Sequence, residues 1–280
     1  MKPLSLGFSP CPNDTFIFNA LVSARDQASA PLFTKPHLED VETLNRWAFE
    51  HRLDVTKLSF HALGHVLDEY CVLQAGSALG RGCGPLLVAS SHLSIEQLPG
   101  RTIAIPGKYT TAALLFKMFL PDCKQQVEMS FEHIMESVQR GEVDAGVIIH
   151  ESRFTYQRYD LVCLQDLGQW WEDISGLPIP LGCIAARRSL GAARIKEIEY
   201  HIRTSLDTAY ANPEACMEYI RMHAQETEDE VIQNHIDLYV NDFSIDLGAE
   251  GRAAIDTFLN KGRAQKVLPN LPINTFCQEC

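Results

Sequence analysis

The sequence predicts an α/β protein made of two lobes. Apolar runs that fit buried strands alternate with amphipathic runs that fit helices along most of the chain, a pattern typical of parallel sheets covered by helices. Two strand-like segments, residues 101–105 and 178–187, stand next to glycine or proline and are interpreted as crossings between the lobes. We expect residues 1–100 and 182–280 to form a large discontinuous lobe, and residues 101–181 to form a smaller inserted lobe.

The clearest strand lies within residues 142–151, which end in His150 and Glu151. A helical pattern over 131–140 ends at a glycine, and five small or apolar residues follow at 145–149. Such a run fits a strand buried on both faces of a parallel sheet, and open α/β sheets bind ligands beyond the carboxyl ends of their strands. His150 is therefore a candidate catalytic residue, although a strand-end histidine capped by a backbone carbonyl fits equally well. Side chains alternate along a strand, so Glu151 should point to the opposite face and not share the role of His150.

A proline-rich turn follows the first predicted strand, residues 4–9. Pro10 and Pro12 restrict the backbone and remove two hydrogen-bond donors, so this turn should be stiff. Asn13 or Asp14 can cap the helix that follows. Asp14 can instead be a polar group held rigidly at the carboxyl end of the strand, and both residues are candidates for a ligand site.

A second predicted strand, residues 54–59, contains Lys57, Leu58 and Ser59 at its end and leads into a predicted helix over 60–70. A lysine near a strand end is usually only solvated. A lysine beside a serine at a strand-to-helix turn can bind a carboxylate, so this segment is a candidate substrate-binding site.

His61 and His65 share one face of that helix, because they lie four residues apart. The segment lacks the glutamate of a zinc-protease helix, and two histidines are fewer ligands than zinc normally takes. We therefore expect no metal site in this protein.

Two further loops are candidates for ligand contact. The glycine-rich residues 76–85 lead into an apolar strand and not into a helix, so they lack the context of a dinucleotide-binding loop; their glycines permit positive φ or a close backbone approach. Thr110 and Thr111 begin a predicted helix, whose unpaired N–H groups attract anions. Capping alone would account for one threonine, and the pair favours an anion pocket.

Charge and hydropathy exclude several kinds of partner. The chain has 36 acidic and 24 basic residues and a formal net charge of -12, which argues against nucleic acid or an anionic membrane as a partner. A small anionic ligand responds to local donors and is not excluded. No apolar segment approaches the roughly 20 residues that span a bilayer, and the N-terminus lacks the apolar core and cleavage site of a signal peptide. We expect a cytoplasmic protein.

The nine cysteines are widely spaced and odd in number, unlike those of a secreted disulfide scaffold. We expect them to be reduced. The terminal Cys277-Gln278-Glu279-Cys280 is a single Cys-x-x-Cys pair at a chain end, and we expect it to be inert.

Five motifs occur in an order typical of one enzyme family. They are SPCPNDTF at 9–16, KLS at 57–59, GRGCGP at 80–85, PGKYTTA at 106–112 and IHE at 149–151. The chain resembles the 1,4-dihydroxy-6-naphthoate synthases, which cleave cyclic de-hypoxanthine futalosine in the futalosine route to menaquinone. The resemblance covers the whole chain and implies a two-lobed, periplasmic-binding-protein-like fold (type II) with the ligand in the cleft between the lobes.

The resemblance implies a carbon–carbon lyase that needs no metal or redox cofactor and releases the dihydroxynaphthoate and a dihydroxyacetone-like fragment. In that family a histidine at the place of His150 is the proton acceptor. Segments matching Lys57 to Ser59 and Thr110 to Thr111 hold the anionic small-molecule substrate. Two alternatives share the fold: a chorismate dehydratase-like enzyme of the same pathway, which we do not associate with the SPCPND segment, and a cytoplasmic solute-binding protein, which needs no base.

Overall fold

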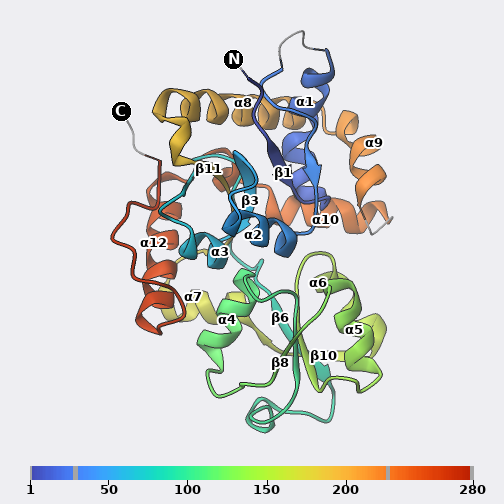
Figure 1. Ribbon diagram of the computed structural model, residues 1–280. Coiled ribbons are helices and arrows are strands. Elements are labelled where there is room, and N and C mark those ends of the chain that lie inside the picture. Colours follow the sequence, from blue (N-terminus) through green and yellow to red (C-terminus); the bar gives the residue numbers. More distant parts are fainter. Residues whose placement is uncertain (1, 28–30, 225–227, 278–280) are drawn as a thin grey trace.

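The computed structural model describes residues 2–27, 31–224 and 228–277 and consists of two stacked α/β lobes (Figure 1). Both chain ends lie on the upper lobe, and the middle of the chain forms the lower lobe. Each lobe contains one sheet that combines parallel and antiparallel strands. The predicted α/β class with two lobes is confirmed.

The upper sheet has the strand order β2-β1-β3-β11-β4, and β5 also pairs with β11. Its strands are β1 (Leu6–Phe8), β2 (His37–Leu38), β3 (Val55–Ser59), β4 (Tyr70–Val72), β5 (Ala78–Gly80) and β11 (Ile179–Arg187). β1, β2 and β3 are parallel, and β11 runs antiparallel to β3, β4 and β5. All five residues of β3 are buried, so Lys57 and Ser59 are held in fixed positions.

The lower sheet has the strand order β10-β6-β9-β7-β8. Its strands are β6 (Leu86–Ser90), β7 (Ile103–Ile105), β8 (Gln126–Glu128), β9 (Ala145–Ile148) and β10 (Leu161–Asp166). β7, β8 and β9 are parallel, whereas β6 runs antiparallel to β9 and β10. The parallel core of this sheet brings the carboxyl end of β9, and His150 after it, to the edge that faces the upper lobe.

The sheet pairing moves the boundary between the lobes. Strand β6 lies inside the lower sheet, so the expected boundary after residue 100 is wrong and the lower lobe begins at Leu86. Residues 101–105 contain an interior strand of that sheet and not a crossing, and Gly182 lies in the middle of β11. The misassignment arises because β6 is a short apolar strand whose hydrogen-bond partner, β9, lies more than 50 residues farther along the chain.

Helices cover both sheets and dominate the chain after residue 187. Those of the upper lobe are α1 (Pro12–Gln27), α2 (Val41–Phe49), α3 (Phe60–His65), η3 (Arg188–Leu190), α8 (Ala192–Ala211), α9 (Glu214–His223), α10 (Asp229–Tyr239), α11 (Asp242–Ile245) and α12 (Gly248–Ala264). The helices between β6 and β11 are η1 (Ile95–Gln97), α4 (Thr111–Phe119), α5 (Phe131–Gln139), α6 (Ser152–Thr155), η2 (Tyr156–Tyr159) and α7 (Leu167–Ser175). Within the described residues, no helix combines the length and apolar composition needed to cross a membrane.

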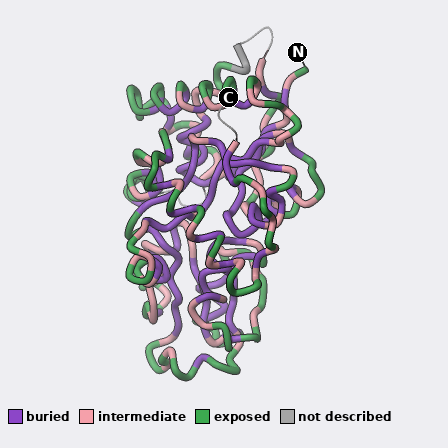
Figure 2. Tube along the Cα trace, turned by 90° about the vertical axis from the view of Figure 1, so that its left-hand side faces the viewer, coloured by how far each residue is buried: buried purple, intermediate pink, exposed green. Residues whose placement is uncertain are grey.

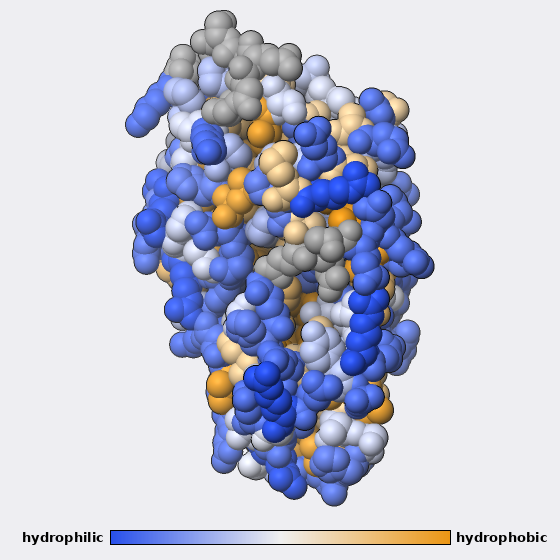
Figure 3. Space-filling model, turned by 90° about the vertical axis from the view of Figure 1, so that its right-hand side faces the viewer, coloured by the Kyte–Doolittle hydropathy of each residue, from blue (hydrophilic) through white to orange (hydrophobic). Residues whose placement is uncertain are grey.

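Buried side chains connect the two lobes. One core cluster includes Leu58 of β3 and Ala185 of β11 together with Leu87 of β6 and Val147 of β9. Figure 2 shows buried chain running through both halves of the molecule. The side turned to the viewer in Figure 3 is mostly hydrophilic, with small separate hydrophobic patches. The lobes are therefore packed against each other, and their shared interior surrounds the site described below.

The chain crosses between the lobes at two adjacent places. The first crossing is residues 81–85, and the second follows β10 and passes through α7. Gly84 and Gly168 meet where these crossings touch, and a Cβ added to Gly84 would lie 2.2 Å from the Cα of Gly168. Arg153 ties both crossings together, because it donates to the carbonyl of Gly84 (2.6 Å) and to Asp166 Oδ2 (2.7 Å).

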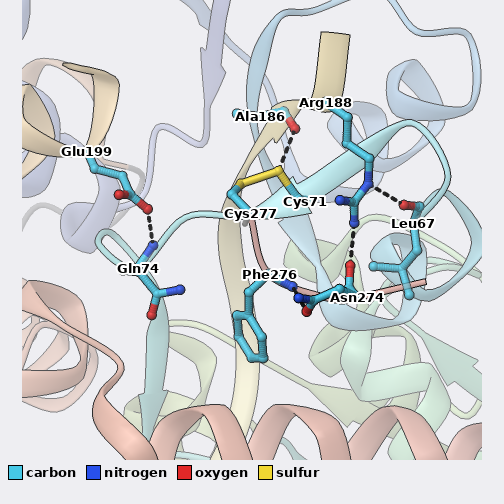
Figure 4. The surroundings of a disulfide bond; sticks show 9 residues. All are labelled: Leu67, Cys71, Gln74, Ala186, Arg188, Glu199, Asn274, Phe276 and Cys277. Atoms are coloured by element: carbon cyan, nitrogen blue, oxygen red, sulfur yellow. Dashed lines mark hydrogen bonds between the residues drawn. A yellow bond between two sulfur atoms is a disulfide. The ribbon is translucent and has the colours of Figure 1, made fainter. Parts of the chain in front are cut away.

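A disulfide joins Cys71 of β4 to Cys277 near the C-terminus, with Cα atoms 5.1 Å apart (Figure 4). The C-terminal segment lies along β4, since Val72 N donates to Thr275 O (3.0 Å) and Cys277 N donates to Val72 O (3.3 Å). The expectation that all cysteines are reduced is wrong for this pair, and Cys277 is not inert. Cys280, the other half of the terminal pair, lies outside the described residues.

Candidate functional site

A cavity of about 630 Å³ lies between the two sheets and is lined by residues of both lobes. Six of the eight candidate residues line it, namely Asn13, Lys57, Ser59, Thr110, Thr111 and His150. The other two are Asp14, which is fully buried against Lys57, and Leu58, whose side chain packs in the core. Alternation along β3 places Lys57 and Ser59 on the cavity side and Leu58 on the other.

Lys57 and Asp14 form a buried ion pair beside the cavity. Lys57 Nζ lies 2.5 Å from Asp14 Oδ1, and the two side chains are 7% and 0% exposed. Ser9 completes the coordination of the carboxylate by donating from its backbone N (3.1 Å) and its hydroxyl (2.7 Å) to Asp14 Oδ2. The helix α1 begins at Pro12, before Asn13 and Asp14, so the expectation that one of them caps it is wrong. Asp14 lies in the first turn and has the other predicted role, a charge held rigidly at the carboxyl end of β1.

Asn13 links this ion pair to His235 of α10. Asn13 Nδ2 donates to Asp14 Oδ1 (2.9 Å), and the side-chain oxygen of Asn13 lies 2.9 Å from His235 Nε2. Because the amide nitrogen must face the carboxylate, its oxygen is the acceptor and His235 Nε2 carries the proton. His235 lines the cavity but belongs to no sequence motif, and it lies 222 residues from Asn13. The one signal in the sequence is its position beside the apolar residues Ile232 and Ile236, which indicates the buried face of α10.

His150 follows β9 in a left-handed backbone conformation, with φ 57°. Its Nδ1 lies 3.3 Å from Cys11 Sγ, and its ring is parallel to that of His235, with centroids 6.1 Å apart. Burial lowers the pKa of His150 to about 4, and the positive charge of Lys57 acts in the same direction against the opposing effect of Asp14. His150 is therefore a neutral imidazole at pH 7. It is held by the thiol of Cys11 and the rings of His235 and Phe131, and not by the backbone carbonyl that was the alternative.

Glu151 lies on the same side as His150, contrary to the expected alternation. β9 ends at Ile148, and the positive φ of His150 turns the chain before Glu151. Glu151 is 4% exposed, and its carboxylate, a ring nitrogen of His150 and Cys11 Sγ lie within 4.8 Å of one another. A second cavity, of about 330 Å³, is lined by these three residues and by Asp40 and His223. His150 and Val41 line both cavities, so the two cavities adjoin.

The two threonines have different roles at the start of α4. Thr110 caps the helix, because its hydroxyl accepts from Ala113 N (3.2 Å) and donates to Gly107 O (2.8 Å). The hydroxyl of Thr111 accepts from Phe60 N (3.1 Å) and donates to Leu181 O (2.5 Å). Thr111 therefore connects the lower-lobe helix with β11 and with the start of α3 in the upper lobe.

His61 and His65 do not assemble a metal site with other described residues. His61 Nδ1 lies 3.1 Å from the carbonyl of Thr110, and the two rings pack beside Tyr109. Burial lowers the pKa of His61 to about 3. These histidines support the α3–α4 contact between the lobes.

Two lobes joined by paired crossings, with a cavity between them that is lined from both, define the class of periplasmic-binding-protein-like folds. The periplasmic aliphatic sulphonate binding protein SsuA from Escherichia coli matches with a TM-score of 0.68 over 100% of this chain and 92% of that chain, at 11% identity. At that identity the likeness concerns the fold alone. Protein AF1704 from Archaeoglobus fulgidus has a TM-score of 0.88 and 36% identity over 95% of this chain and 98% of that chain.

Sequence relatives define the family more closely. A family model described as menaquinone biosynthesis matches residues 4–264. A 1,4-dihydroxy-6-naphthoate synthase of Thermus thermophilus is 51% identical over 99% of this chain and 100% of its own length, and one of Streptomyces coelicolor is 44% identical over 96% and 95%. The chain belongs to the menaquinone biosynthesis family, among the 1,4-dihydroxy-6-naphthoate synthases, as the five motifs predicted.

Proposed function

We propose that this enzyme is a carbon–carbon lyase that cleaves cyclic de-hypoxanthine futalosine to 1,4-dihydroxy-6-naphthoate and a dihydroxyacetone-like fragment, with His150 as the general base. Similarity to two synthases over nearly the whole chain supports this reaction. The observation that carries the proposal is the neutral imidazole of His150, which opens on the cavity between the lobes.

The environment of His150 suits proton removal next to a carbonyl. A general base must be unprotonated at the working pH, and burial keeps this imidazole neutral because it lowers the pKa to about 4. Asp14 and Asp40 act in the opposite direction on that pKa, so their negative charges stabilise the imidazolium once it forms. Closed lobes exclude water from the cavity, which strengthens these interactions.

The anionic end of the substrate would lie at the start of α4. The nine-residue helix presents its first N–H groups there, beside Thr110 and Thr111 in the cavity wall. The hydroxyl of Thr111 is already bonded to Leu181, so we assign the carboxylate to the helix N–H groups. Ser59 accepts from Asn45 Nδ2 (3.1 Å) and can donate its own O–H to a substrate oxygen.

The test is incubation of the purified enzyme with cyclic de-hypoxanthine futalosine and, separately, with chorismate. We expect the naphthoate chromophore and an equimolar three-carbon fragment from the first substrate and no product from the second. Dehydration of chorismate would assign the protein to the sister reaction. Binding of either compound without turnover would favour a solute-binding protein.

A further inference from the structure

Three potential metal ligands, Cys11, His150 and Glu151, converge at the wall of the second cavity. Cys11 Sγ, a ring nitrogen of His150 and a carboxylate oxygen of Glu151 lie within 4.8 Å of one another. The shortest of these contacts joins Cys11 Sγ to His150 Nδ1 at 3.3 Å. That separation is close to the spacing of two ligands on one tetrahedral ion, given metal–ligand bonds of roughly 2.0–2.3 Å.

His235 lies next to this group, outside the set of atoms within 4.8 Å of one another, and is the candidate for a fourth ligand. Its Nδ1 is buried without a hydrogen-bond partner in a side chain that is 1% exposed, and it lies 4.0 Å from Glu151 Oε1. Because Nε2 donates to Asn13, Nδ1 carries the lone pair, and it lies on the side of the ring near Glu151. A buried acceptor without a donor costs free energy, and a cation would satisfy it.

The structure leaves room beside these groups. Cys11, His150 and Glu151 all line the second cavity, which has a volume of about 330 Å³. Cys11 and His235 come from the upper lobe, whereas His150 and Glu151 come from the lower lobe. An ion held by Cys11, His150 and Glu151 would therefore be reached through the second cavity and would bind both lobes, and His235 would reach it from the side of the first cavity.

We propose that Cys11, His150, Glu151 and His235 form an inhibitory site for a thiophilic divalent cation of the zinc class. A thiolate, two imidazoles and a carboxylate are ligands that zinc prefers, whereas magnesium and calcium prefer oxygen alone. On binding, the Cys11 thiol releases its proton to solvent and forms a sulfur–metal bond, with no change of oxidation state. A neutral imidazole that binds a metal through Nδ1 carries its proton on Nε2, so His150 can no longer accept one.

The first experiment measures zinc binding directly. Metal-free enzyme competes with a chromophoric chelator for added zinc chloride, and we expect one tightly bound zinc ion per chain that excess magnesium does not displace. Cys11→Ser should weaken binding at least as much as the roughly 10–100-fold loss typical of removing an outer-shell partner. Cys163→Ser is the matched control, since Cys163 is an exposed free thiol outside the cluster, and it should bind zinc like the parent.

A second readout identifies the ligands. Cobalt in place of zinc should give a thiolate-to-cobalt absorption band in the parent and in Cys163→Ser, and none in Cys11→Ser. If Cys11→Ser fails to fold, His235→Gln replaces it, and its zinc affinity is measured by the same chelator competition. Full zinc affinity of His235→Gln or Cys11→Ser would overturn the proposal. Two further variants, Cys163→Ser and Cys280→Ser, change cysteines that are not proposed ligands, and loss of the ion from either would also overturn it.

Activity then tests the inhibitory effect. One equivalent of zinc should suppress turnover of the parent and of Cys163→Ser, and a chelator should restore it. Unchanged turnover with the site fully loaded would refute inhibition. These outcomes are independent of the proposed reaction, because zinc binding is measured without substrate and the reaction is tested on metal-free enzyme.

Discussion

At the scale of single residues, the backbone conformation of His150 determines the chemistry of the site. A left-handed conformation is uncommon for a residue with a Cβ, and here it redirects the chain so that His150 and the following Glu151 both reach the space between the lobes. The thiol of Cys11 holds Nδ1, and burial raises the pKa of that thiol. The cysteine is therefore a neutral partner and does not charge the imidazole.

Replacement of His150 by asparagine should remove the base and leave the protein folded. His150→Asn preserves polarity and much of the size but cannot accept a proton at neutral pH. Turnover should fall by about two to four decades, the usual range for one acid–base group, with substrate affinity and melting temperature little changed. The matched control is His133→Asn, which alters an exposed histidine of α5. Near-full turnover of His150→Asn would show that His150 is not the general base, and Asp14 would then be the next candidate.

The lowered pKa of His150 predicts a specific dependence on pH. In the unfolded chain the imidazole binds a proton below about pH 6.5, whereas in the folded protein it stays neutral down to about pH 4. The unfolded state therefore binds more protons between these values, and acidification through this window destabilises the folded protein. His150→Asn lacks this contribution, so unfolding free energies measured from pH 7 to 4 should fall less steeply for the variant than for the parent. Parallel curves would contradict the shift, as would parent activity lost already near pH 6.5.

At the scale of elements, the C-terminal segment is held to β4 by covalent and polar contacts. Besides the disulfide, Arg188 donates to the carbonyls of Leu67 and Asn274 (Figure 4). Phe276 is 3% exposed and lies beneath the guanidinium of Arg252. These contacts secure β4, which pairs with the central strand β11.

Loss of the Cys71–Cys277 bond should lower the stability of the oxidised protein. The bond closes a loop with a sequence separation of 206 residues, and removal of a native disulfide typically costs roughly 2–5 kcal/mol. Cys277→Ser should melt at a lower temperature than the parent, and a reductant should lower the parent to the same value without affecting the variant. Cys163→Ser should remain reductant-sensitive. A parent indifferent to reductant would show that the bond contributes nothing to stability.

The contact between the two crossings should invert the usual effect of alanine in a helix. Alanine stabilises a helix interior by roughly 0.5–1 kcal/mol relative to glycine, but a Cβ at Gly168 would lie 2.6 Å from the Cα of Gly84. Gly168→Ala should therefore destabilise, by about the 1–3 kcal/mol typical of overpacking. Gly251→Ala is the control in α12, where the added Cβ meets the movable ring of Phe243 at 3.2 Å. Equal melting temperatures for the two variants would mean that the crossings separate freely.

At the scale of the whole molecule, the cavity and the group of Cys11, His150 and Glu151 beside it are built from both lobes. Contacts between Cys11 and His150 and between Thr111 and Leu181 span the boundary. Separation of the lobes would disassemble the site, whereas closure completes it around the substrate.

We predict that the lower lobe moves as a unit, from Leu86 to the end of β10, about the crossings at Gly84 and Gly168. Substrate contacts both lobes in the proposed site, so it should favour the closed arrangement. Solution scattering at saturating substrate should give a smaller radius of gyration than scattering of the free enzyme. Identical profiles would argue that the cleft does not open.

Local patterns in the sequence determined the α/β class, the family, most of the strands and helices, and six residues that line the cavity. The apolar run before His150 and the Lys57-Leu58-Ser59 strand end are such patterns, because burial and alternation act on neighbours in the chain. The tertiary structure alone decided the positions of Cys11, Glu151 and His235, the start of the lower lobe at Leu86, and the Cys71–Cys277 bond. Each of these depends on contacts between distant segments or, for Glu151, on a left-handed turn that breaks the alternation. Local hydrophobic periodicity does not specify which distant segments of the chain come into contact. The packing of the two lobes against each other determines those contacts.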